Sequence, residues 1–158
     1  MTPEAATLAA LNTHLLAHVP LNWESNGDPV QWEVDGETLT WTYPMLGDLP
    51  VLWREKDSVR PPEYLMVDHL PNISTRPMLD SARQDLSGIY QLTLARAKGQ
   101  HEIVYREQAA QILAHFMDAV TLTADGKTIT ITQATAGQGR ADGTRWMIPI
   151  SIYYRLDA

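Results

Sequence analysis

The chain has 158 residues, a formal net charge of −7 at pH 7 and no cysteine. A single domain of this length buries ~68–70% of the surface that its unfolded chain exposes, so a hydrophobic core is expected. No apolar run reaches the ~18 residues of a membrane span, and the N-terminus lacks the features of a signal peptide. Without cysteine there is neither a disulfide framework nor a thiolate metal site. Because its few Lys and Arg residues are scattered, direct nucleic-acid binding is not expected.

The chain opens with a helix signal. Thr2 is suited to the N-cap, and Pro3 to the first helical position. Apolar residues then recur at spacings of three and four, which indicates one face of an amphipathic helix that ends at Pro20. This apolar face consists of Leu8, Leu11, Leu15 and Val19.

A hairpin follows the first helix. The alternation between Val30 and Tyr43 predicts two short strands that reverse at Asp35 and Gly36. Proline and glycine interrupt the chain beyond it. We therefore predict a single domain over residues 1–158, in which residues 21–60 are a hairpin and loop insertion. The hairpin region itself, residues 26–47, is expected to be an addition to the core.

The middle of the chain contains two strand signals separated by a long loop. Residues 63–70 predict a strand, whereas residues 73–85 have no sustained period and indicate a polar loop. Met78 and Leu79 are the apolar exceptions in this loop, and a loop of this length is often functional. Strand alternation resumes at residues 90–94.

A second helix is predicted from Glu102 to Asp118. Its apolar side chains form one stripe, and its opposite face carries charged and amide groups. The stripe consists of Ala109, Ile112, Leu113, Phe116 and Val120.

Gly88 stands just before the predicted strand at residues 90–94. A glycine in this position indicates a bulge or a close contact.

Two final strands are predicted over residues 128–132 and 147–154, both with period-two alternation. Since Pro149 cannot donate to a ladder, the last strand is expected to be an edge strand or to present this position outward. The order of elements predicts an α+β fold. In it, an antiparallel or mixed sheet of about four strands has two helices packed on one face, with the inserted N-terminal β-hairpin added.

No residue pattern indicates catalysis, a metal or a cofactor. His14 and His18 have a chelating spacing but lack the glutamate of a zinc-protease motif, so a structural role is predicted for them. His69 and His115 are expected at the edge of the core, and His101 at a helix start. No serine stands in a nucleophile elbow.

The glycine-rich loop before the last strand resembles a phosphate cradle only superficially. Gly137, Gly139 and Gly143 lead into a strand, whereas a phosphate loop leads into a helix whose amides meet the anion. We interpret this loop as a flexible hairpin tip. Its alternative role is an arm that contacts a neighbouring subunit.

Four segments stand out by their order and spacing: PEYLMVDHLP at 62–71, GIYQLTL at 88–94, EQAAQI at 107–112 and RWMIPISIYYR at 145–155. On these segments, the chain from residue 61 onward resembles the tail-terminator-like family of long-tailed phages and prophages. Residues 21–49 depart from the family pattern by an additional hairpin.

The resemblance implies a non-enzymatic virion protein of the phage tail, assembled in the host cytoplasm. Such a protein forms a homohexameric ring on the tail tube, ends tube polymerisation, and offers a surface to the head-tail connector or neck protein. A small-molecule or peptide-binding module, with a pocket lined by Trp23, Trp32 and Trp53, is the alternative. The candidate contacts with another subunit or the tube are Arg76, Met78, Leu79, Arg83, Gly137, Gly139, Arg140, Pro149 and Tyr153.

Overall fold

The protein is described by a computed structural model. Its β-strands form two sheets, and its two described helices both pack against the larger one. The structure describes residues 3–17, 30–41, 45–46, 49–53, 60–71, 86–98, 102–118, 121–124 and 126–157.

The larger sheet dominates the described residues. Seven strands follow one another in the order β3-β4-β5-β6-β10-β8-β7, and β9 pairs with the free stretch of β10 beside β8. All neighbours are antiparallel except β4 and β5, which are parallel. The strands are β3 (Met45–Leu46), β4 (Leu49–Trp53), β5 (Tyr64–Pro71), β6 (Leu86–Ala97), β7 (Thr121–Ala124), β8 (Lys127–Ala136), β9 (Arg140–Asp142) and β10 (Arg145–Asp157).

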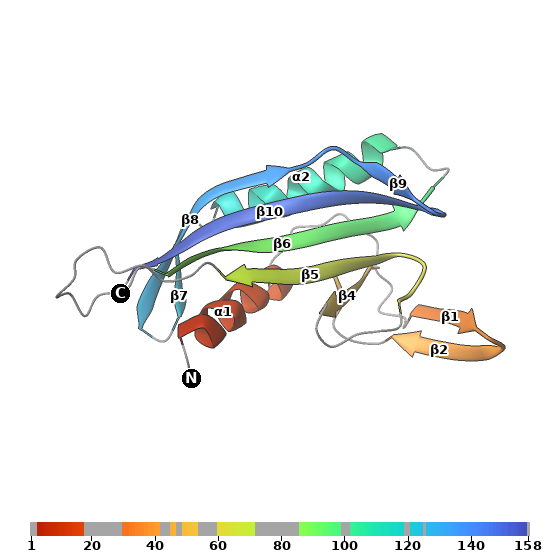
Figure 1. Cartoon of the computed structure of the whole chain (residues 1–158), viewed down its shortest axis with the longest axis horizontal. Helices are drawn as coiled ribbons and strands as arrows, with labels where there is room; N and C mark the ends of the chain where they lie inside the picture. The colour runs from red at the N-terminus through yellow and green to blue at the C-terminus, as the bar shows by residue number, and fades with distance from the viewer. Residues whose placement is uncertain are drawn as a thin grey trace.

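The sheet curls into a half-barrel around two helices, α1 (Pro3–Ala17) and α2 (Glu102–Asp118). Figure 1 shows α2 crossing behind β8 and β10, and the sheet passing over α1. One cause of the curl is a bulge in β8. Tyr153 pairs with Gln133 and Tyr154 pairs with Ile131, so Thr132 is an extra residue that increases the local twist.

The predicted fold class is wrong in its sheet. Instead of about four strands with helices on one face, the described residues form a mostly β structure whose sheet curls around the helices. The strand β4 was missed because the first four residues of its apolar run LPVLW are all buried, so it lacks alternation and resembles a proline-broken loop. The short strand β7 was missed because four residues, TLTA, carry too little pattern.

The main core lies between the concave side of the sheet and the helices. The predicted second helix agrees with α2 at both ends, and its Ala109, Ile112 and Phe116 are buried. From α1, Leu11 and Leu15 enter the same core. The sheet contributes the alternating residues of its long strands, which are Leu65, Val67, Tyr90, Leu92, Leu94, Ile129, Ile131, Ile148, Ile150, Ile152, Tyr154 and Leu156.

A second, smaller core lies on the opposite, helix-free face of the sheet. Its members alternate along the strands with those of the main core, so their side chains point the other way. Trp41 packs against this cluster. The cluster consists of Leu52, Tyr64, Met66, Ala95 and Met147.

Trp41 belongs to the hairpin of β1 (Val30–Val34) and β2 (Glu37–Trp41), which forms a two-stranded sheet of its own. The predicted reversal is confirmed: Asp35 and Gly36 have φ angles of 52° and 82°. This left-handed pair is the geometry of a tight hairpin turn. The proposed insertion 21–60 is described only in part. Within it, β4 is buried in the larger sheet, whereas the hairpin pairs only with itself among the described strands.

Of the two alternatives expected for the last strand, the edge position is wrong, whereas Pro149 does point away from the main core that Ile148 and Ile150 enter. Strand β10 pairs with β6 on one side and with β8 and β9 on the other. Pro149 is tolerated because it stands where β8 has ended and β9 has not begun. There the Gly137 amide donates to the Pro149 carbonyl at 2.8 Å. Proline has no backbone N–H to donate in return, and because no strand lies beside it at this position, no strand-to-strand hydrogen bond is lost.

Gly88 makes a close contact, as expected, and its pairing with both neighbours is continuous. Tyr154 lies directly opposite on β10, and its ring covers Gly88 from the core side. A Cβ at this glycine would stand 2.5 Å from the Tyr154 hydroxyl and 3.0 Å from the Leu70 carbonyl oxygen. His69, on β5, is hydrogen-bonded to the same hydroxyl. The glycine thus gives the tyrosine room to reach the histidine.

We predict that Gly88→Ala lowers the free energy of unfolding by about 1–3 kcal/mol, because the added methyl group displaces the Tyr154 ring. Denaturant unfolding measures the change. The neighbouring Ser87→Ala is the control and should alter stability by less than about 0.5 kcal/mol. Equal stability of Gly88→Ala and the parent protein would contradict the packing described.

Tyr90 connects β6 to α1. Its buried hydroxyl donates to Asn12 Oδ1 at 2.6 Å, and burial raises the pKa of this phenol well above its ordinary value. In the unfolded chain a tyrosine ionises near pH ~10. The raised pKa favours the neutral phenol in the folded state, so the contribution to stability is complete below pH ~10 and is lost as the pH rises further.

We predict that, between about pH 9 and 11, the free energy of unfolding falls less steeply with pH in Tyr90→Phe than in the parent. The reason is that the variant lacks a phenol that ionises only in the unfolded state. At neutral pH the variant should be less stable by about 1 kcal/mol or more, since Asn12 loses its donor. Denaturant unfolding across this pH range tests both effects. The same alkaline slope in the parent and the variant would refute the assignment, and Tyr153→Phe on the exposed face is the control.

Candidate functional site

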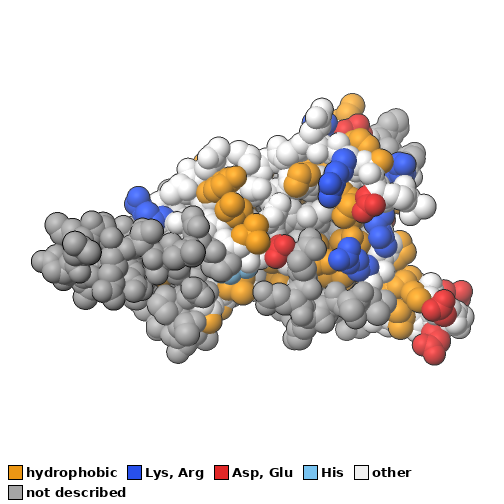
Figure 2. All heavy atoms as spheres, in the orientation of Figure 1, with side chains coloured by type: hydrophobic (Ala, Val, Ile, Leu, Met, Phe, Trp, Pro, Cys, Tyr) orange, Lys and Arg blue, Asp and Glu red, His pale blue; other side chains and the backbone are white. Residues whose placement is uncertain are grey.

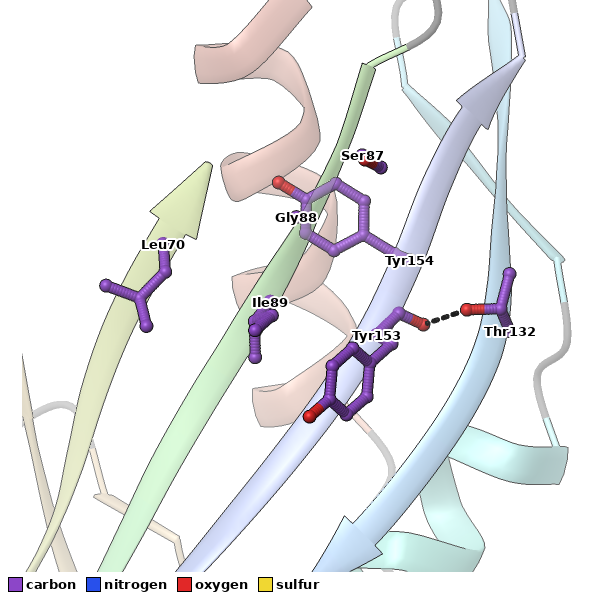
Figure 3. A pocket seen from close by; sticks show the side chains of 7 residues that line it. All are labelled: Leu70, Ser87, Gly88, Ile89, Thr132, Tyr153 and Tyr154. Atoms are coloured by element: carbon purple, nitrogen blue, oxygen red, sulfur yellow. Dashed lines mark hydrogen bonds between the residues drawn. The ribbon is translucent and has the colours of Figure 1, made fainter. Parts of the chain in front are cut away.

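The helix-free face of the sheet has a hollow near the point where β5 ends and β6 begins. Leu70 of β5, Ile89 of β6, Thr132 of β8 and Tyr153 of β10 surround a space of about 350 Å³. Figure 3 shows these side chains on neighbouring strands, with α1 behind the sheet. The remaining lining residues are Ser87, Gly88 and Tyr154.

The rim of this hollow is an exposed apolar surface. Leu70 is 45% exposed and Tyr153 is 36% exposed, and both are among the exposed large hydrophobic residues of the described chain. Figure 2 shows hydrophobic side chains gathered on this face of the molecule. In contrast to the other end of the same face, where Trp41 packs against the second core, no described element covers these side chains.

Local sheet geometry holds Tyr153 outward. Tyr153 and Tyr154 are consecutive on β10, so their side chains leave opposite faces: Tyr154 is buried and Tyr153 is exposed. The Thr132 hydroxyl donates to the Tyr153 carbonyl at 3.3 Å, which ties the bulge of β8 to this position (Figure 3). The hollow therefore rests on rigid strands.

Of the residues proposed as subunit or tube contacts, Tyr153 lies at the hollow. Pro149 lies on the same face of β10, two alternations away, and is half-buried. Arg140 is exposed on β9, opposite Met147. Four others fall outside the described residues, namely Arg76, Met78, Leu79 and Arg83.

Within the glycine loop that the sequence interpretation took as a hairpin tip, Gly143 lies at the tip, whereas Gly137 and Gly139 lie along β10. Gly137 lies against Pro149, where a Cβ would stand 2.7 Å from Cγ of the proline ring. Gly139 lies against the Trp146 indole at a distance that leaves no room for a Cβ. The tip is at Gly143, with φ of 60°, between β9 and β10. Only glycine lets the backbone approach β10 so closely.

His14, one of the two histidines with a chelating spacing, packs against His115 of α2. His14 and His115 stack with ring centroids 4.0 Å apart and planes 3° from parallel. Nε2 of His14 lies 2.9 Å from the His115 carbonyl oxygen, and Nε2 of His115 lies 2.6 Å from the His14 carbonyl oxygen. Since carbonyl oxygens only accept, both Nε2 atoms donate, and the pair joins the last turns of α1 and α2. His18 and His101 lie outside the described residues.

The described residues contain no group of three or more acidic, histidine or cysteine side chains that could hold a metal. No described helix is long and apolar enough to cross a membrane.

The alternative pocket of three tryptophans is not formed by the described residues. Trp53 packs against the main core from β4, whereas Trp32 is in the hairpin and Trp23 lies outside the described residues. The hollow at Leu70 and Ile89 was not predicted. Its signal was present, because both residues alternate with buried neighbours on their strands, but two separate strands had to be brought side by side.

A rigid, partly apolar sheet face is suited to contact with another protein, since an exposed apolar area of this kind typically marks an interaction site. The fold and this face thus indicate an assembly protein.

Comparison with known families gives the same class. The family described as phage tail terminator protein matches residues 28–154. The chain belongs to this family, and its role is structural, in the phage tail. Membership confirms the family resemblance seen in the sequence and implies a non-enzymatic protein of the virion tail that interacts with other tail components.

Solved structures support the fold. Six solved chains match this protein. One superposes with a TM-score of 0.71 at 16% sequence identity, covering 100% of this chain and 98% of the other. At this identity the match establishes the fold alone. Among curated proteins, none matches the chain.

We predict that Tyr153→Ser changes the free energy of unfolding by less than about 0.5 kcal/mol but reduces association with tail components. The neighbouring Tyr154→Ala should instead cost about 3–5 kcal/mol, since it empties a core site and removes the His69 bond. Thermal melting and co-sedimentation with tail tubes separate the two effects. A Tyr153→Ser protein that binds tubes normally would exclude this face as a contact surface.

Proposed function

We propose that the protein caps the phage tail tube as a homohexameric ring, ends tube polymerisation, and provides the surface to which the head connector or neck protein docks. The observation that carries this proposal is the family match over residues 28–154. Assembly takes place in the host cytoplasm before the tail joins the head.

The helix-free face supports a role in contact with a neighbouring tail component. Its exposed side chains stand on paired strands: Tyr153 lies between β6 and β8, and Leu70 is paired with Ile89 of β6, so both are positioned before any partner arrives. Preorganisation of this kind lowers the entropic cost of binding. The hollow between them can accept an apolar side chain from a partner.

The loop carrying Met78 and Leu79 is proposed as a further contact with a subunit or with the tube. It leaves β5 at Pro71 and returns to β6 at Leu86, next to the strand ends that form the hollow. A contact in this region would extend the same surface.

The function is tested by adding the purified protein to polymerising tail-tube subunits. Electron microscopy should show ring-shaped density with six-fold symmetry at one tube end, and tubes should stop growing once capped. Omission of the protein should give tubes of uncontrolled length. Tubes that grow equally in both cases, with no protein bound at their ends, would refute the function.

In this assay a Leu70→Ser/Tyr153→Ser variant tests the helix-free face, and a Glu107→Gln variant is its matched control. Glu107 is exposed on α2, away from the helix-free face, so its change should leave capping intact. The small-molecule or peptide-binding alternative gains no specific support from the described residues, because Trp53 packs against the main core, Trp32 belongs to the hairpin, and Trp23 lies outside the described residues.

A further inference from the structure

The turn of the β1–β2 hairpin projects away from the rest of the described chain (Figure 1). Among the described strands, β1 pairs only with β2, and the hairpin stands apart from the larger sheet (Figure 1). An isolated two-stranded hairpin is marginally stable at best, so such an element normally packs against something else.

The hairpin has an apolar face and a polar face. Residues directly opposite each other point to the same side, so Trp32 and Leu39 share a face with the pair Val30 and Trp41. Trp41 is anchored on the second core, but Trp32 and Leu39 are only half-buried, and Val34 near the turn is 39% exposed. The apolar face therefore extends beyond its anchor as far as Val34, whose cross-strand partner on this face is Glu37, whereas Glu33 points to the opposite face.

The turn of the hairpin is strongly acidic. Glu33, Asp35 and Glu37 are all exposed, and residues 30–41 contain no Lys or Arg. None of the three carboxylates forms an ion pair within the described structure. Figure 2 shows acidic side chains together at the far end of the hairpin.

The same end of the molecule carries a group of opposite charge. Strand pairing brings the ends of β6, β9 and β10 together, and the guanidinium groups of Arg60 and Arg145 both lie over the Tyr64 ring, at 5.9 and 5.1 Å from its centroid. The amide of Lys98 donates to the Thr144 carbonyl at 2.9 Å, which places this lysine at the same corner. The basic corner consists of Arg60, Lys98, Arg140 and Arg145. Two carboxylates lie beside it in the described residues: Asp142 on β9, and Glu63, which accepts from the Ala97 amide and forms an ion pair with Arg96.

The acidic hairpin and the basic corner are complementary, yet no ion pair joins them within the described part of one chain. Figure 2 shows the basic side chains above the hairpin end, separated from it along the molecule. The two groups lie on different elements, so one copy can present its hairpin while it receives another at its corner. Repeated head-to-tail contacts of this type close into a ring when the rotation permits.

We infer that the β1–β2 hairpin docks onto the basic corner of a second copy of this chain, with Val34 and the apolar face adding contact area beside the charges. The inference rests on the proposed ring and names the contact that closes it. Attraction between Glu33, Glu37 and the partner's corner steers the two copies together and fixes their order in the ring.

Two charge-reversal variants test the inference. The hairpin variant is Glu33→Lys/Glu37→Lys, and the corner variant is Lys98→Glu/Arg140→Glu. All four positions are exposed, so both proteins should melt like the parent. Arg145 is left unchanged because it donates to the carbonyls of Pro61 and Pro62, and Asp35 because its φ of 52° disfavours most other residues.

Each variant alone should assemble roughly tenfold more weakly than the parent or worse, because like charges then meet at every contact. An equimolar mixture should recover assembly, since the reversed hairpin of one variant meets the reversed corner of the other, and the unchanged pair remains complementary. Mass photometry and cross-linking, with and without tube ends, measure this. Assembly of the parent should weaken as salt is raised to about 0.5 M, because screening shortens the range of the charges.

Glu107→Lys on α2 is the control for net charge and should assemble like the parent. If the parent forms rings and both variants form them equally well, or if the mixture does not recover assembly, the docking inference is wrong and the ring proposal stands. If the parent forms no ring, alone or on tubes, the proposed function itself fails.

Discussion

The two-sided pairing of β10 is the constraint on which the rest of the structure depends. Held by β6 on one side and by β8 and β9 on the other, this strand must send alternate side chains to opposite faces. Ile148, Ile150 and Ile152 enter the main core with the helices. Met147 and Tyr153 point to the helix-free face, which is thereby fixed as a second surface.

Two irregularities adapt this strand to its neighbours. Pro149 stands at the gap between β8 and β9, and the extra residue Thr132 shifts the register of β8 beside Tyr153. Glycines admit close contacts at three points along β10: Gly88 below Tyr154, Gly137 at Pro149 and Gly139 at Trp146. The curl of the sheet is compatible with dense packing because these glycines have no side chain at the points where a ring or another strand comes close to the backbone.

The helix-free face connects this architecture with assembly. At one end Trp41 joins the hairpin to the second core, and at the other end Leu70 and Tyr153 remain exposed around the hollow. A protein of the phage tail terminator family works by contact with other tail components. Surfaces carried by paired strands suit that task, because their side chains do not have to be ordered on binding.

Local signals in the sequence were sufficient for several elements. The stripe from Ala109 to Phe116 gave α2 with both ends correct, and Asp35-Gly36 gave the hairpin turn, because helix periodicity and left-handed turns depend on neighbouring residues. The family was also evident from the order of short segments, and the family match confirms it.

Long-range pairing was decided only by the tertiary structure. β4 looked like a broken loop because a strand buried on both faces shows no alternation, and the centrality of β10 was hidden because Pro149 suggested an edge. The hollow joins Leu70, Ile89, Thr132 and Tyr153 from four strands, and the basic corner joins residues from separate strand ends. The sequence by itself determined which residues form turns, which form helices and which form strands with alternating side chains. Which strands become neighbours depends on the free energy of the whole packed sheet, and no local window contains it.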